Sequence, residues 1–334
     1  MTFHSRLLRL VRLGSAGEAG DCPLWYGMEE VPALQAALQG QRYYRLNSDL
    51  ETLRKSNAEA WALSLQAIAV TPVNRMEFDW WVGESSHLAE PWLVRALRVI
   101  RDLSDDRSVS PSSLTVVGLM HYFKQLEQAE RDLAEAAQRM PDCAEPWAWL
   151  LYTGLLAGMD EETLSSRFAE ATMRDPQHLM THVFRVRVLS DEQDAAQAAL
   201  RFAREVSDAS PYGHALHALI AQAWIEAWSW WIYIDGPDRA RQRLMAPEVV
   251  AEINAAYQRM EMAPGSLYRP VPYGFFGLLF YLMKQREPAW ECLQAMGDTA
   301  CGYPWTYLRE HAADFLGASR IVERVRAEVE GLPA

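Results

Sequence analysis

Three prolines stand at a fixed spacing in the middle of the chain and limit what it can fold into. Pro141, Pro176 and Pro211 are 35 residues apart, and each follows a helix-like segment: LAEAAQRMP, FAEATMRDP and FAREVSDASP. Pro72 closes a similar segment, ALSLQAIAVTP, almost two periods earlier. Because proline cannot continue a helix and biases its predecessor toward extended backbone, each of these prolines is expected to mark a turn. A period of this length is typical of one helix hairpin per repeat, stacked on its neighbours.

The residues before each proline share a second pattern, with mostly small or apolar residues at relative positions 0, 4 and 7 and the proline at 12. These positions lie on one face of a helix, where small side chains let a partner helix approach closely. The copies are Ala129, Leu133 and Ala136; Leu164, Phe168 and Ala171; Ala199, Ala203 and Val206; and, more weakly, Ala60, Ser64 and Ala67. Apolar residues recur three and four positions apart, and alternating strand-like runs are scarce, so the sequence predicts an all-α fold.

In this pattern the chain resembles the tetratricopeptide repeat, whose second helix carries A-x3-F-x2-A-x4-P. The resemblance covers about residues 57–225. Trp147 and Leu150, in EPWAWLLYTG, fit the aromatic residue and the leucine expected in a first helix, whereas His182 and Arg185 replace them one repeat later. The resemblance implies a tetratricopeptide-like α-solenoid of stacked helix hairpins, with less regular N- and C-terminal helices.

The expected organisation is a short N-terminal segment followed by one helical-repeat domain. Residues 1–22 join an amphipathic stretch, MTFHSRLLRLVRL, to a flexible glycine-containing linker, and they lack the apolar core and cleavage site of a secretory signal. We expect the stretch to pack on the body, with contact to a membrane surface as the alternative. Residues 23–334 form the domain, with regular repeats at about 57–235 and an irregular helical part at 236–334.

The charge and the cysteines restrict the partners and the location. The formal net charge is -12. A surface this acidic repels phosphate backbones, so direct nucleic-acid binding is not expected, whereas a basic protein would be attracted and steered. The four cysteines are scattered without a C-x-x-C pair, which argues against a zinc ribbon or a redox dithiol. Unpaired thiols favour a reducing compartment, so a cytoplasmic location is expected.

The segment AWIEAWSWWIYI holds four tryptophans and one carboxylate, Glu226. A charge at the centre of the helix and flanks without positive residues argue against a membrane span. Trp224, Trp228 and Trp231 share a helical face and are expected in the core. Glu226 and Trp230 lie on another side, where the alternative is a partly open aromatic cleft that contacts a partner.

The repeat architecture predicts an extended concave binding surface made by the first helices of the repeats. The sequence contains no nucleophile elbow, Walker A loop, dinucleotide fingerprint or kinase motif, so the first hypothesis is a non-enzymatic protein-binding scaffold without a cofactor. We expect it to sequester a basic protein, as bacterial immunity proteins or dedicated chaperones do. The candidate contact residues are Glu145, Tyr152, Arg187, Asp191, Gln222, Glu226 and Trp230.

Two pairs of histidines are candidates for a metal site. His178 and His182 are four residues apart, and His214 and His217 are three apart. Neighbouring first helices could bring such imidazoles to one ion, and zinc needs three or four ligands. No HExxH signature accompanies them, so hydrogen-bonded structural histidines are the first expectation.

A second enzymatic alternative involves the segment MEFDWWVGESSH. Asp79 and Glu84 lie on either side of Trp80 and Trp81. Carboxylates among aromatic rings are typical of sites that cleave sugars, although spacing alone does not pair these two acids. The alternative hypotheses are therefore a metal- or carboxylate-dependent hydrolase, or an aromatic pocket that binds a sugar or a lipid.

Overall fold

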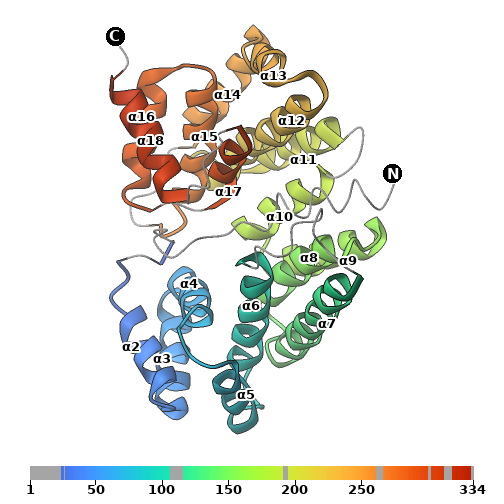
Figure 1. Ribbon diagram of the computed structural model, residues 1–334, viewed down its shortest axis with the longest axis vertical. Coiled ribbons are helices and arrows are strands. Elements are labelled where there is room, and N and C mark those ends of the chain that lie inside the picture. Colours follow the sequence, from blue (N-terminus) through green and yellow to red (C-terminus); the bar gives the residue numbers. More distant parts are fainter. Residues whose placement is uncertain are drawn as a thin grey trace. The chain divides into compact units, whose positions relative to one another are not determined.

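The computed structural model describes most of the 334-residue chain, and every regular element in the described part is helical (Figure 1). The all-α prediction is therefore confirmed for this part of the chain. The N-terminal segment predicted for residues 1–22 and the candidate contact residue Asp191 lie outside it. The described ranges are 24–25, 27–105, 116–190, 195–260, 266–299, 302–311 and 318–331.

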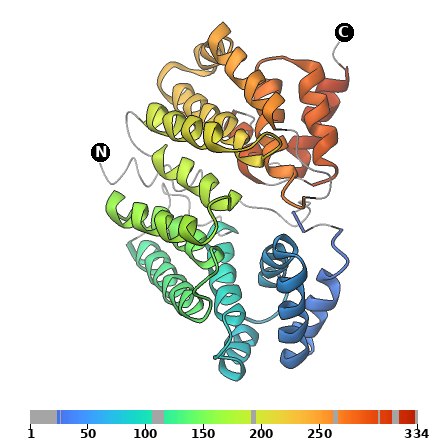
Figure 2. The same ribbon diagram turned by 180° about the vertical axis from the view of Figure 1, so that it is seen from behind.

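Two compact units make up the fold, Trp25–Thr181 and His182–Ala334. The first unit contains eight complete helices among its described residues, and α10 (Leu179–Leu189) begins at its end. Helices α6 to α9 pack in chain order, each on the next, and α4 contacts α2, α3 and α6, as Figure 1 and Figure 2 both show. The eight helices are α2 (Val31–Gln39), α3 (Tyr43–Ser56), α4 (Ala58–Ala69), α5 (Arg75–Glu84), α6 (Glu90–Asp105), α7 (Val116–Arg139), α8 (Glu145–Ala157) and α9 (Glu161–Arg174).

The helix ends follow local sequence signals. Asn74 caps α5 by accepting a hydrogen bond from the Met76 amide, and Asp160 caps α9 by accepting one from the Thr163 amide. Gly158 ends α8 with a φ of 68°, a left-handed conformation that glycine adopts without steric cost. The prolines that stand 35 residues apart lie between helices, as predicted from their spacing.

An arginine at the end of α7 ties this helix to the start of α6. Arg139 donates from Nε to the carbonyl of Ser86, and its guanidinium lies 4.9 Å from the ring centroid of Trp92. The same guanidinium pairs with Glu135, one turn earlier on α7. Such a cation–π contact is worth about 0.5–2 kcal/mol, depending on how far it is shielded from water.

The same local structure is built again one hairpin later. Arg174, at the end of α9, donates from Nε to the carbonyl of Pro141, lies 5.0 Å from the ring centroid of Trp147, and pairs with Glu170. In both copies the tryptophan ends the sequence AEPW, and the carbonyl belongs to the residue six positions before it. In both helix pairs, α6–α7 and α8–α9, an arginine at the end of the second helix therefore binds the start of the first helix through the same set of contacts.

The second unit is organised around α12, which contacts α11, α13, α14 and α15. A 3-10 helix, η1, precedes α12 in place of a single longer helix. The C-terminal helices contact one another and α15. The described elements of this unit after α10 are α11 (Ala195–Ala209), η1 (Ala215–Ala218), α12 (Leu219–Asp235), α13 (Pro237–Leu244), α14 (Pro247–Arg259), α15 (Pro270–Leu282), α16 (Arg286–Met296), α17 (Gly302–Trp305), η2 (Thr306–His311) and α18 (Ala318–Gly331).

Helix α12 carries the tryptophan-rich segment. Trp224 and Trp228 are buried, as expected, while Trp231 is half-buried with its ring 6.0 Å from that of Trp224. Trp230 is half-buried and stacks on the exposed ring of Tyr233, 6.0 Å away. Among the helices of the described ranges, none has the length and apolar character needed to cross a membrane.

Candidate functional site

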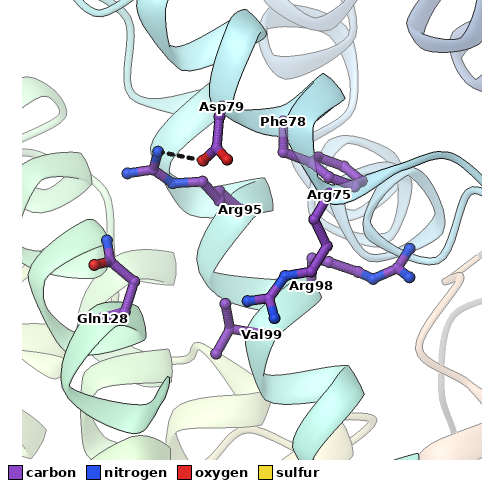
Figure 3. Close-up of a pocket in the computed structure, with 7 residues that line it drawn as sticks. All are labelled: Arg75, Phe78, Asp79, Arg95, Arg98, Val99 and Gln128. Atoms are coloured by element: carbon purple, nitrogen blue, oxygen red, sulfur yellow. Dashed lines mark hydrogen bonds and ion pairs between the residues drawn. The ribbon is translucent and has the colours of Figure 1, made fainter. Parts of the chain in front are cut away.

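A pocket of about 470 Å³ lies between α5, α6 and α7 of the first unit (Figure 3). The lining residues of α5 and those of α6 follow the i, i+3, i+4 spacing of a single helical face, so one face of each of these two helices lines the pocket. The lining is polar and rich in arginine. It consists of Arg75, Phe78 and Asp79 from α5, Arg95, Arg98 and Val99 from α6, and Gln128 from α7.

Arg95 occupies one side of the pocket and is held by two carboxylates. Its Nε and Nη2 each donate over 2.8 Å to the carboxylate of Asp132, and its Nη1 donates over 2.9 Å to Asp79. The Asp132 side chain is 1% exposed and also accepts from Gln128 Nε2. Burial alone would lower the pKa of Arg95, but these hydrogen bonds outweigh it and raise the pKa. The pocket therefore contains a permanent cation, Arg95, which is held in place by Asp132.

The other two arginines of the lining, Arg75 and Arg98, have N–H groups that are not used in the hydrogen bonds described below. Arg98 donates from Nε to Asp102 over 2.8 Å and from Nη1 to the carbonyl of Thr71 over 3.1 Å. Arg75 donates from Nη1 to Gln125 over 3.3 Å, and its Nε lies 3.8 Å from Asp102. Within the described part of the chain, the Nη2 of neither Arg75 nor Arg98 has a hydrogen-bond partner.

The charges that face the pocket are unequal in sign. Three guanidinium groups and a single carboxylate, that of Asp79, belong to its lining. Asp132 is behind Arg95, and Asp102 is shared between Arg75 and Arg98. Guanidinium groups present donors in a planar fork that matches carboxylate and phosphate oxygens, so the arrangement is suited to an anionic group.

Asp79 and Glu84, the two acids of the predicted sugar-cleaving alternative, have different surroundings. Asp79 is bound to Arg95 at the pocket. Glu84 is exposed, and its charge acts on Tyr43 instead. Burial, with the carboxylates of Glu77 and Glu84, raises the pKa of Tyr43 to about 12. The structure gives Asp79 a cation and Glu84 a phenol as neighbours, so it does not bring them together as an acid and a base.

The first histidine pair is divided between two environments. His178 Nδ1 lies 2.8 Å from the Thr181 hydroxyl, and its Nε2 lies 3.0 Å from Glu145 Oε2. Burial alone would lower the pKa of His178, but the hydrogen bond and charge of Glu145 outweigh it and raise the pKa. His182 is buried in the second unit, where its ring stacks 5.9 Å from that of Phe202.

The second histidine pair is also held by hydrogen bonds. His217 Nε2 lies 2.9 Å from the Pro211 carbonyl, which can only accept, so the ring donates there and Nδ1 accepts from the Ser207 hydroxyl. Burial lowers the pKa of His217, which favours this neutral form. His214 accepts from the Leu216 amide. Across the described ranges, no group of three or more His, Cys, Asp or Glu side chains is placed to hold a metal ion.

Three of the candidate contact residues lie inside their units. Glu145 is buried and accepts a hydrogen bond from Trp149 Nε1 over 2.8 Å, and Tyr152 is buried on the same helix. Gln222 is fully buried, with its Nε2 donating over 2.9 Å to the Val183 carbonyl. Their burial follows from the positions of α8 and α12, each of which packs against more than one other helix.

Two further candidates, Glu226 and Arg187, meet in a cluster of the second unit. Tyr303 donates to Glu226 over 2.7 Å, and Tyr307 donates to both of its carboxylate oxygens over 2.9 and 3.0 Å. Burial, together with the charge of Glu226, raises the pKa of Tyr303 well above its usual value. Arg187 is buried, with its guanidinium 4.6 Å from the Tyr303 ring centroid. Sequence reasoning missed this cluster, because the tyrosines are 77 and 81 residues from Glu226.

Comparison with known proteins adds no family assignment. No protein-family model matches the chain, and no curated protein matches it with significant sequence similarity. Function is therefore inferred from the helical fold, the repeated local structure, the charge and the pocket.

Proposed function

We propose that the chain is a non-enzymatic helical-repeat protein that binds another protein. The observation that carries the proposal is the local structure built twice around AEPW, in which Arg139 and Arg174 each close a helix pair. Helices α6 to α9 also pack in chain order. Both features are expected of stacked helix hairpins, and proteins of that architecture use extended surfaces to bind other proteins.

The charge supports a basic partner. With a net charge of -12, the chain attracts positively charged proteins over a distance set by the ionic strength. Sequestration of a basic protein, in the manner of an immunity protein or a dedicated chaperone, is the specific form of the proposal. A complex of this kind forms fast at low salt because opposite charges steer the encounter.

A cytoplasmic location accompanies the proposal. Cys143 and Cys292, the free cysteines among the described residues, are not paired with each other. Burial raises the pKa of each thiol to about 12, so both remain protonated and unreactive at neutral pH. Two inert thiols are compatible with a reducing compartment.

Capture followed by reconstitution tests the proposal. The full chain is immobilised and exposed to a lysate of its source cells at low salt, and captured proteins are identified by mass spectrometry. Each captured protein is then purified and titrated with the chain by calorimetry. We expect a basic protein that forms a complex of fixed stoichiometry. If no captured protein forms such a complex once both components are pure, the proposal is wrong.

A further inference from the structure

We propose that the pocket between α5, α6 and α7 binds a small molecule that carries a carboxylate group. Arg75, Arg95 and Arg98 supply the donors, and the site is separate from the protein-binding role proposed above. Figure 3 shows Arg95 bound to Asp79 on one side of the pocket, with Gln128 extending from the facing helix. The ligand class follows from which donors are free, which carboxylate can be displaced and what size the pocket has.

The free donors belong to Arg75 and Arg98. The Arg75 side chain is 51% exposed, and its long 3.8 Å contact with Asp102 is a weak restraint. Within the described ranges, its Nη2 and that of Arg98 have no hydrogen-bond partner, although guanidinium groups carry five N–H donors between three nitrogens. An incoming carboxylate can therefore accept from either of these groups without breaking an existing hydrogen bond.

The displaceable carboxylate is that of Asp79. Its side chain is 60% exposed, and an exposed ion pair contributes little net stability. Asp132 differs, because it is 1% exposed and holds Arg95 through two hydrogen bonds. We infer that a ligand carboxylate replaces Asp79 on Arg95 Nη1 while Asp132 keeps the guanidinium in place. Asp79 then acts as an internal competitor for the ligand.

The size and lining of the pocket define the rest of the ligand. A volume of about 470 Å³ falls within the range of small-molecule sites, and Phe78 and Val99 add an apolar surface to the arginines. The groups that already occupy these guanidiniums are the planar carboxylates of Asp79, Asp102 and Asp132. The pocket therefore fits a short molecule with one or two carboxylates and a small apolar body, rather than a tetrahedral phosphate.

Calorimetric titration of the full chain with succinate tests the proposal, and inorganic phosphate serves as the second probe. Two variants alter the pocket through exposed side chains that the fold tolerates, D79N and R75Q. Their matched controls are D49N and R45Q, which change the exposed pair Arg45–Asp49 on α3 by the same charges. Arg95 is left unchanged, because its removal would leave Asp132 buried without a partner.

We expect wild-type protein to bind one succinate and D79N to bind it up to about fivefold more tightly, because the exposed pair that competes with the ligand contributes little. R75Q should bind succinate roughly tenfold more weakly, because it loses a charge-assisted hydrogen bond to the ligand. The two controls should stay within about twofold of wild type, because surface charges are screened. The proposal fails if succinate does not bind to wild type or D79N. It also fails if D49N tightens binding as much as D79N, or if phosphate binds and succinate does not.

Discussion

Replacement of Asp132 by asparagine is the most informative perturbation of the first unit. The substitution keeps the shape of the side chain and removes its charge. The Asp132 carboxylate, 1% exposed, accepts three hydrogen bonds, two from Arg95 and one from Gln128. An amide presents N–H groups to at least one of these donors. Arg95, 19% exposed, would therefore keep its charge and lose its main partner.

The structure sets the size of the effect. Two unit charges about 4 Å apart interact with about 4 kcal/mol at the effective dielectric of partly buried sites. Removal of one member of a buried ion pair costs about 3–5 kcal/mol. Asp79 still pairs with Arg95 in this variant, but an exposed ion pair offsets at most about 1 kcal/mol of the loss. We therefore expect D132N to lower the free energy of unfolding by about 3 kcal/mol.

Urea denaturation, followed by tryptophan fluorescence and by circular dichroism, measures this change. D79N provides the comparison and should cost less than about 1 kcal/mol, because its carboxylate is largely in water. The variant that carries both R95M and D132L should recover most of the loss, since an apolar pair of similar volume replaces the ion pair without leaving a charge behind. A cost below about 1 kcal/mol for D132N would refute the reasoning.

Three further predictions concern other parts of the fold. R174A removes the contact with Trp147 and a hydrogen bond to the Pro141 carbonyl, so it should lower the free energy of unfolding in urea by about 2 kcal/mol. An unchanged free energy would mean that Arg174 does not hold the α8–α9 pair together. His178 has a raised pKa in the folded state, so its contribution to the stability of the fold is complete below its unfolded pKa of about 6.5. This contribution is lost as the pH rises through the folded pKa. The melting temperatures of wild type and H178Q should therefore differ more at pH 6 than at pH 8.5, and the opposite trend would exclude the ion pair with Glu145 as the cause. Y307F removes the donor to both oxygens of Glu226 and should lower the free energy of unfolding by about 1–2 kcal/mol in urea, whereas an unchanged value would mean that water replaces the hydroxyl.

The local features of the fold were predictable from sequence because they depend on neighbouring residues. The spacing of Pro141, Pro176 and Pro211 placed three breaks between helices correctly. A helix was expected to contain Trp147 and Leu150, and α8 lies there. Helical periodicity and proline stereochemistry act over a few residues, so a single sequence suffices to locate them.

The burial of Glu145 could not be predicted in this way, because it depends on a residue far away in the sequence. Its position in a first helix suggested an exposed surface, but His178, 33 residues later, provides a partner that allows the carboxylate to be buried. A polar residue gives no signal for burial until its partner is known. The same holds for Gln222, whose side chain donates to the carbonyl of Val183 39 residues earlier.

The pocket could not be inferred from spacing either. Arg95 and Asp132 belong to different helices and are 37 residues apart, so their bidentate pair depends on the packing of α6 on α7. One signal was present in the sequence. Arg95, Arg98 and Asp102 stand at i, i+3 and i+7, which places three charged residues on one face of an amphipathic helix.

The repeated local structure also left a trace in the sequence. The tetrapeptide AEPW occurs at residues 89–92 and 144–147, and both copies start a helix pair that is closed by a later arginine. The proline period alone does not relate them, because the copies are 55 residues apart rather than 35. The identity of the two tetrapeptides is the sequence signal that relates α6 to α8.

The salt dependence of the reconstituted complex tests the central claim most directly. The dissociation constant of the purified chain and its captured partner is measured at several salt concentrations between about 50 and 500 mM. If a chain with a net charge of -12 binds a basic protein, the complex should weaken steadily as salt rises, through slower association above all. A dissociation constant that stays the same over this range, or an acidic partner, would contradict the account.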